Sequence, residues 1–75
     1  MYINITLETV GRRFDLSIDE RGSASAVYDI LLERGMAEGP APVRYRSMLL
    51  GEWIDAKQPL ANQGVVSGDL LTAQI

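Results

Sequence analysis

The sequence of 75 residues contains no cysteine and no histidine. Their absence excludes disulfide bonds, thiolate nucleophiles, metal sites built on thiolate or imidazole, and the usual general base at neutral pH. A domain of this length without such chemistry depends on a well-packed core, which 47% hydrophobic residues can supply. We therefore expect one domain over residues 1–75, with no cofactor, no metal and no catalytic residues.

Basic residues are also few. Seven Lys and Arg stand against ten Asp and Glu, giving a net charge of −3, so the chain lacks the clustered positive field that binds nucleic acid or anionic membranes. No run of about 20 apolar residues could span a bilayer. The opening segment 1–7 alternates apolar and polar residues and lacks the pattern of a targeting segment, which leads us to expect a cytoplasmic protein.

Two neighbouring segments show the period-2 alternation of half-buried strands. In residues 1–8 and 14–19 the apolar positions share one face: Met1, Ile3, Ile5 and Leu7 in the first, Phe14, Leu16 and Ile18 in the second. Residues 9–12 are a predicted turn, because Gly11 can adopt a positive φ. The two segments are therefore predicted to form an antiparallel hairpin with one apolar face.

A single helix is predicted to cover that face. Ser23 can cap its start by accepting a hydrogen bond from the backbone N–H of Ala26, and Gly35 can end it. Between them the apolar residues are spaced as one helical stripe: Ala24, Val27, Tyr28 and Leu31.

The second half of the chain predicts further strands. Residues 35–42, rich in Gly and Pro, form a crossing loop. Alternation over residues 43–50 predicts a third strand, which places Tyr45 and Ser47 on one face and the arginines on the other. Gly51 allows a reversal into a short strand at 52–54, Leu60 anchors the next loop, and residues 70–75 form a closing strand. The fold class is α+β: a β-grasp, with one helix packed on a mixed sheet of four to five strands.

Three segments resemble the YukD/EsaB group of ubiquitin-like proteins encoded with bacterial type VII (WXG-type, ESX-like) secretion systems. They are the opening Met1–Leu7, the strand Phe14–Asp15–Leu16, and the closing stretch from Leu60 to Leu71. The closing stretch also resembles the ubiquitin-like domain of EccD-type membrane subunits, although its Gly64-x-x-x-Gly68-Asp69-x-Leu71 pattern is common in β-grasp domains. Because this chain stops before any membrane segment, we expect a free-standing form.

The resemblance implies a non-enzymatic module that binds proteins. It implies a cytoplasmic accessory component whose partners are cytoplasmic parts of the membrane secretion apparatus, with no nucleic acid and no direct membrane insertion. Ubiquitin-fold proteins commonly use the outer face of the sheet for recognition. On that face we place Arg44, Arg46, Met48, Thr72 and Gln74, with Tyr2, Asn4 and Thr6 completing it, and Met48 resembles in position the apolar centre of the ubiquitin patch.

Trp53 has strand parity opposite to Ile54, which we expect to be buried. Its indole is then either a partly exposed anchor for a partner or part of a small satellite core folded over residues 55–59.

The carboxylates from Asp15 to Asp69 are interpreted as solvated surface, not as acid–base pairs. Asp69 is placed in a turn where its side chain can bind backbone N–H groups.

Two other functions stay open. A β-grasp carrier or modifier needs a flexible C-terminal Gly-Gly, whereas this sequence ends in Leu71–Ile75, and Ile75 is predicted to continue a strand. A small regulatory subunit of a multicomponent enzyme would share the fold and need no catalytic residues of its own.

Overall fold

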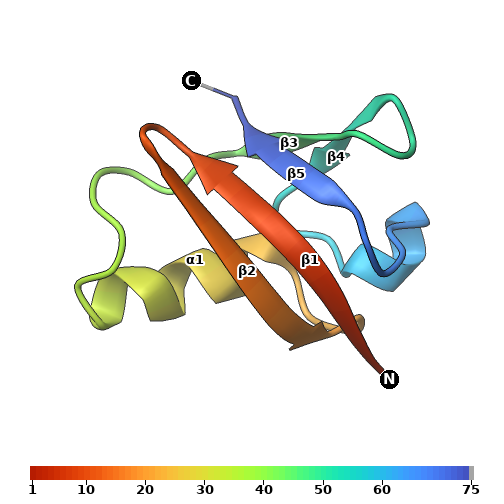
Figure 1. Ribbon diagram of the computed structural model, residues 1–75, viewed down its shortest axis with the longest axis horizontal. Helices are drawn as coiled ribbons and strands as arrows, with labels where there is room; N and C mark the ends of the chain where they lie inside the picture. The colour runs from red at the N-terminus through yellow and green to blue at the C-terminus, as the bar shows by residue number, and fades with distance from the viewer. Residues whose placement is uncertain (75) are drawn as a thin grey trace.

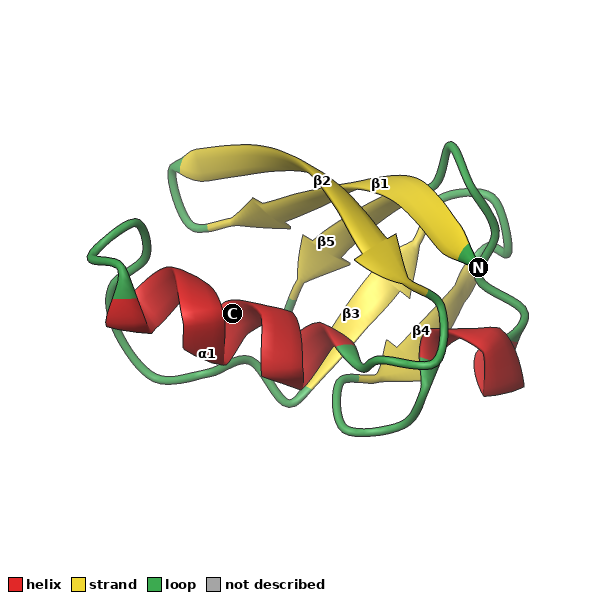
Figure 2. Ribbon diagram, turned by 90° about the horizontal axis from the view of Figure 1, so that it is seen from below, coloured by secondary structure: helices red, strands yellow, loops and turns green. Residues whose placement is uncertain are grey.

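The computed structural model describes residues 1–74. Its sheet has five strands in the order β2-β1-β5-β3-β4, in which β5 runs parallel to β1 and every other neighbouring pair is antiparallel. One helix, α1, lies behind the sheet in Figure 1, and Figure 2 shows the two layers from the side. The elements are β1 (Tyr2–Thr9), β2 (Arg12–Asp19), α1 (Ala24–Glu33), β3 (Arg44–Ser47), β4 (Glu52–Asp55), the 3-10 helix η1 (Leu60–Gln63) and β5 (Leu70–Ala73). The predicted α+β β-grasp is confirmed.

The hairpin of β1 and β2 has a tighter turn than the sequence predicts. Thr9 pairs with Arg12, so only Val10 and Gly11 connect the strands. Gly11 has a φ of 72°, which is why a residue without a Cβ stands there. The register carries Ile3, Ile5 and Leu7 into the core.

The limits of α1 follow its predicted caps. The Ser23 hydroxyl accepts a hydrogen bond from the Ala26 N–H at 3.1 Å. At the other end Gly35 has a φ of 71°, and the Met36 N–H donates to the Leu31 carbonyl at 2.8 Å. These bonds satisfy backbone groups that a helix end leaves unpaired. The face of α1 that packs on the sheet carries the buried Ala24, Tyr28 and Leu31.

The core lies between α1 and the sheet, and the loops close its sides. The remaining buried apolar residues are Ala37, Tyr45, Ile54, Ala56, Leu60, Val65 and Leu71. Phe14, Leu16 and Ile18 are only partly buried, because β2 is an edge strand. The Tyr28 hydroxyl donates to the Glu38 carbonyl at 2.7 Å, whereas the buried Tyr45 hydroxyl has no partner among residues 1–74. Burial raises the pKa of Tyr45 above its ordinary value.

The third strand is shorter than predicted. It ends at Ser47, and residues 48–51 form a turn in place of the expected strand residues. Val43 and Leu49, which the alternation placed inside, are 70% and 54% exposed. The reason is tertiary: the Leu49 N–H donates to the Asp69 carboxylate at 3.0 Å, and the Gly51 N–H donates to the Ser47 carbonyl at 3.0 Å. These bonds take the place of the β-sheet hydrogen bonds that residues 48–50 would make in a longer strand. The expected strand position of Ile75 lies outside the described residues.

Candidate protein-interaction surface

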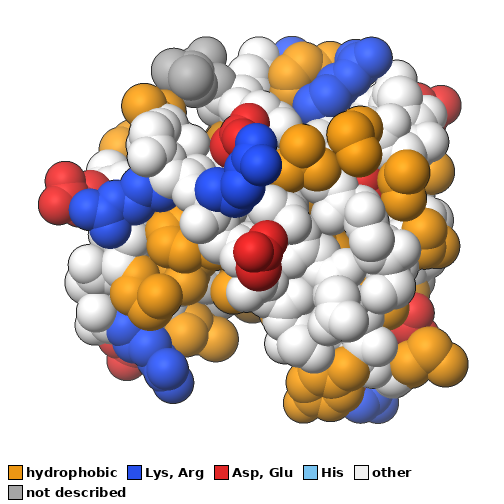
Figure 3. Space-filling view, viewed as in Figure 1, with side chains coloured by type: hydrophobic (Ala, Val, Ile, Leu, Met, Phe, Trp, Pro, Cys, Tyr) orange, Lys and Arg blue, Asp and Glu red, His pale blue; other side chains and the backbone are white. Residues whose placement is uncertain are grey.

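One row of side chains crosses all five strands on the face of the sheet opposite α1. In register order the row is Arg13, Glu8, Thr72, Arg46 and Trp53. Because neighbouring strands lie about 4.8 Å apart, the row is about 19 Å long. Figure 3 views this face of the molecule and shows basic side chains beside hydrophobic ones at its upper edge, over β3 and β4.

Trp53 lies at the β4 end of the row and is 44% exposed. The guanidinium carbon of Arg44 is 4.5 Å from the centroid of the Trp53 ring, and that of Arg46 is 5.6 Å away. Both distances fall within the range of a cation–π interaction, about 6 Å. Of the two alternatives for Trp53, the structure has the partly exposed one: two arginines hold its ring in place on the sheet.

Arg44 and Arg46 also contact β5 and the residue that follows it. Arg46 pairs with Thr72 in the sheet register. The Nε of Arg44 donates to the side-chain oxygen of Gln74, and the Gln74 N–H donates to the Arg44 carbonyl at 3.2 Å. The prediction that Thr72 and Gln74 lie beside the arginines is confirmed. We call Arg44, Arg46, Trp53, Thr72 and Gln74 the outer surface.

Met48 does not lie on a strand, contrary to the prediction. It begins the turn after β3, where its N–H donates to the Leu70 carbonyl at 3.0 Å and its side chain is 59% exposed. Leu49 and Leu50 follow it and are 54% and 37% exposed. We call Met48, Leu49 and Leu50 the apolar turn. The outer surface therefore has an apolar border instead of an apolar centre.

Tyr2 and Asn4 do not lie beside the arginines. Strand β5 pairs with β1 only from Thr6 onward. Before that point, Asn4 binds the turn that leads into β5: its N–H donates to the Ser67 hydroxyl at 3.0 Å, and its carbonyl accepts from the Gly68 N–H at 2.7 Å. Of the three β1 residues expected to complete the face, only Thr6 reaches the part of the sheet that β5 shares.

Asp69 is a buried residue that holds the apolar turn in place through hydrogen bonds. It is 1% exposed, so the expectation that it is solvated is wrong. Its carboxylate accepts hydrogen bonds from the Ser47 hydroxyl and from the N–H groups of Leu49 and Leu70, the last two at 3.0 and 2.8 Å. The prediction that Asp69 binds nearby backbone N–H groups is confirmed. Its position between Gly68 and an apolar strand is the sequence feature that indicates this role.

The two ends of the row differ in charge. At the β2 end, Arg13 pairs with Glu8 at 2.7 Å, and this hydrogen bond raises the pKa of the Arg13 guanidinium. At the β4 end, neither Arg44 nor Arg46 has a carboxylate within ion-pair distance among residues 1–74. The sequence did not indicate the Glu8–Arg13 pair, because it depends on the exact hairpin register. One end of the row is neutralised and the other keeps its positive charge.

Residues 1–74 contain no group of three or more acidic side chains placed to hold a metal ion. No helix within residues 1–74 has the length and apolar character needed to cross a membrane.

The chain matches no family model and no curated protein. It is similar to several solved structures. One is the ubiquitin-like domain of an Arabidopsis thaliana protein, with 14% identity, a TM-score of 0.72, and coverage of 99% of this chain and 77% of that chain. A second is the ubiquitin-like domain of Plasmodium falciparum Dsk2, with 22% identity, a TM-score of 0.62, and coverage of 99% and 100%. A third is the EccD5 ubiquitin-like domain from Mycobacterium xenopi, with 21% identity, a TM-score of 0.56, and coverage of 99% and 93%.

At these identities the similarity shows the fold. The chain has the ubiquitin-like β-grasp fold, with one helix on a five-stranded mixed sheet.

Proposed function

We propose that this protein is a non-enzymatic ubiquitin-like module that binds a protein partner through the outer surface and the apolar turn. The observation that carries the proposal is the partly exposed Trp53, whose ring contacts the guanidiniums of Arg44 and Arg46 on the sheet. Trp and Arg are the residues most enriched in the energetic centres of interfaces. A side chain that is already held in place loses little conformational freedom when a partner binds.

The residues contribute in different ways. Trp53 offers the largest apolar contact, and the two guanidiniums offer bidentate hydrogen bonds to carboxylates. Thr72 and Gln74 supply polar contacts beside them. Met48 is unbranched and 59% exposed, so it can adapt to an uneven pocket of the partner.

The finer proposal is that the partner belongs to a bacterial type VII secretion system. It is supported by the resemblance of three segments to the YukD/EsaB group and by the structural similarity to the EccD5 ubiquitin-like domain. In this proposal the protein is a cytoplasmic accessory component that contacts cytoplasmic parts of the membrane apparatus.

Co-purification with secretion components tests both levels of the proposal. Arg46→Glu and Met48→Asp should each abolish recovery of the partner while the variants keep the wild-type circular dichroism spectrum. Arg34→Glu and Met36→Asp are matched controls, because these residues are exposed at the end of α1, in the layer opposite the outer surface. The controls should co-purify as the wild type does.

The outcomes separate the two levels. Wild-type recovery with both Arg46→Glu and Met48→Asp would exclude the outer surface and the apolar turn as the contact area. Recovery of a different protein, lost in those two variants, would keep the contact area and reject the secretion assignment.

A further inference from the structure

Three of the seven basic side chains lie together at the β4 end of the sheet: Arg44, Arg46 and Lys57. Arg44, Trp53 and Lys57 line a shallow cleft of about 400 Å³, together with Val43, Ile54 and Asp55. The protein as a whole carries a net charge of −3. The cleft and the adjoining Arg46 therefore form a local positive site on an acidic molecule.

Among residues 1–74, the carboxylates nearest in the register form no ion pair with these three side chains. Asp55, the cross-strand neighbour of Arg44, lines the cleft and offsets one of the three positive charges, and its carboxylate accepts a hydrogen bond from the Lys57 N–H at 2.8 Å. Glu8, two strands away from Arg46, pairs with Arg13. Among residues 1–74 no ion pair neutralises Arg44, Arg46 or Lys57. The guanidiniums of Arg44 and Arg46 lie against the Trp53 ring, which attracts their charge but does not cancel it.

Exposed apolar side chains of β4 and of the apolar turn lie on the same part of the molecule as these positive charges. The Trp53 ring is 44% exposed, and Met48 and Leu49 of the apolar turn are 59% and 54% exposed. A ligand that covers Trp53 also meets the guanidiniums of Arg44 and Arg46, 4.5 and 5.6 Å from the centre of its ring. Carboxylates satisfy guanidiniums through bidentate hydrogen bonds, which neutral amides cannot match.

We infer that the site binds an acidic segment of a protein partner, in which carboxylates flank a large apolar side chain. The carboxylates pair with Arg44 and Arg46, and the apolar side chain packs on Trp53 beside the apolar turn. This inference rests on the proposed function and specifies the chemistry of the partner. A membrane surface is the less suitable ligand, because recruitment to anionic lipids typically needs clusters of about four to eight basic residues.

The experiment uses the full chain labelled with ¹⁵N and two synthetic peptides. The first peptide alternates Glu with Leu and Phe, and the second has Gln in place of every Glu. The readout is the chemical shift of the Trp53 indole N–H and of the backbone amides of Arg44, Arg46 and Thr72. The acidic peptide should shift these signals and bind about tenfold more tightly than the Gln peptide, and added salt should weaken it.

Variants assign the effect to the positive site. Arg46→Gln should weaken the acidic peptide about tenfold, and Arg46→Lys should have a smaller effect because it keeps the charge but loses the planar fork. Arg34→Gln, the matched control, should bind as the wild type does. Trp53→Ala should weaken both peptides.

The results distinguish this inference from the proposed function. Equal binding of both peptides at Trp53, or no binding of the acidic peptide, overturns the acidic partner. The contact area itself is then judged by Met48→Asp in co-purification, a variant that removes no positive charge. Co-sedimentation with phosphatidylserine vesicles that Arg46→Gln abolishes, without binding of the acidic peptide, overturns the inference in favour of a membrane.

Discussion

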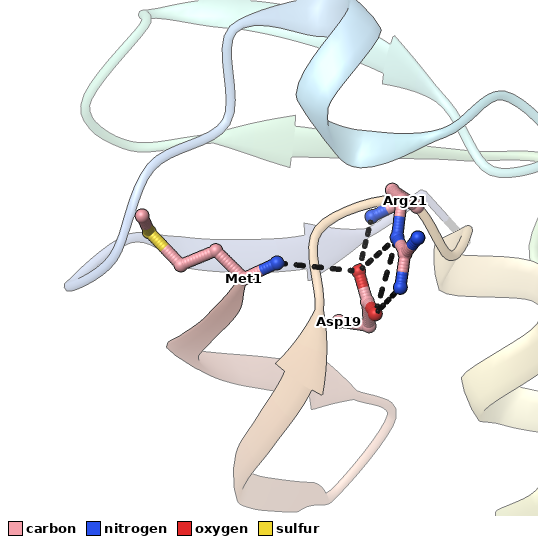
Figure 4. Close-up of polar contacts among 3 residues, drawn as sticks. All are labelled: Met1, Asp19 and Arg21. Atoms are coloured by element: carbon pink, nitrogen blue, oxygen red, sulfur yellow. Dashed lines mark hydrogen bonds and ion pairs between the residues drawn. The ribbon is translucent and has the colours of Figure 1, made fainter.

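Two regions of this molecule use arginine in opposite ways. At the end of β2, Arg21 holds Asp19: its Nη2 is 2.7 Å from Oδ2, and its backbone N–H donates to Oδ1 at 3.0 Å. The N-terminal amine of Met1 lies 3.9 Å from the same carboxylate. Figure 4 shows the three residues converging. At the β4 end of the sheet, Arg44 and Arg46 lie on Trp53 without a carboxylate partner among residues 1–74.

The difference lies in whether a carboxylate is within reach. Arg21 is two residues from Asp19 in the chain, so the pair forms locally, and its hydrogen bonds lower the pKa of Asp19 and raise that of Arg21. The cross-strand neighbours of Arg46 are Thr72 and Trp53, neither of which is acidic. An arginine paired with a carboxylate serves the fold, whereas an arginine that meets only an amide oxygen or an aromatic ring keeps its charge available to another molecule.

The largest expected effect is on the stability of the apolar turn, whose backbone Asp69 holds by hydrogen bonds. Asp69→Ala leaves the Leu49 and Leu70 N–H groups without their acceptor, and we expect it to lower the free energy of unfolding by about 3 kcal/mol. Urea unfolding measures this change. Asp29→Ala, an exposed carboxylate on α1, is the control and should change stability by less than about 0.5 kcal/mol. An Asp69→Ala protein as stable as the control would show that the apolar turn does not depend on Asp69.

Reversing the charge of one arginine from each region, Arg46 and Arg21, tests the comparison directly. Arg46→Glu should weaken binding of the acidic peptide by at least about tenfold and leave the urea midpoint nearly unchanged. Arg21→Glu should do the reverse: it places two carboxylates together at Asp19, lowers the urea midpoint and leaves peptide affinity intact. The comparison fails if both variants change the same property.

The core contains the same contrast between a satisfied and an unsatisfied group. Tyr28 donates its hydroxyl hydrogen bond, whereas the Tyr45 hydroxyl is buried without a partner among residues 1–74. Tyr45→Phe should raise the free energy of unfolding by about 1 kcal/mol, because it removes a desolvated polar group. Tyr28→Phe should lower it by a similar amount. Thermal unfolding of the two variants measures both, and destabilisation by Tyr45→Phe would contradict the contrast.

The smallest expected effect is the pH dependence due to Asp19. Its pKa in the folded protein lies below the ordinary 3.8, so the stability it contributes is present above that value and is lost as the pH falls below about 4. Asp19→Asn should reduce the loss of stability between about pH 6 and pH 3, measured by urea unfolding. Asp29→Asn should leave that loss as in the wild type. Identical profiles for Asp19→Asn and the wild type would show that the Arg21 pair contributes no net stability.

Much of the fold could be predicted from local patterns. Alternation located β1 and β2, the stripe from Ala24 to Leu31 located α1, and Ser23 and Gly35 marked its ends. These patterns work because each is complete within one element: side chains repeat every two residues on a strand and every 3.6 on a helix. The parity argument also placed Trp53 on the open face of the sheet.

The contact area could be predicted only in part. The composition of the outer surface followed from parity, but the end of β3 did not, because Asp69 acts on Leu49 from 20 positions away. Parity also placed Tyr2 and Asn4 on the open face of β1, where both are exposed, but it did not show that they lie away from the arginines: β5 begins opposite Thr6, and only strand register fixes that point.

The sequence by itself determined the order of the strands and α1, most of the buried positions, and the absence of thiol and imidazole side chains. The tertiary structure decided which side chains meet the charges of the sheet: Glu8 meets Arg13 across the hairpin, and the ring of Trp53 meets Arg44 and Arg46. The physical reason is the distance along the chain over which each feature is set. Periodicity is set by neighbouring backbone geometry, whereas the partner of a charged side chain depends on the register between strands that are distant in the chain.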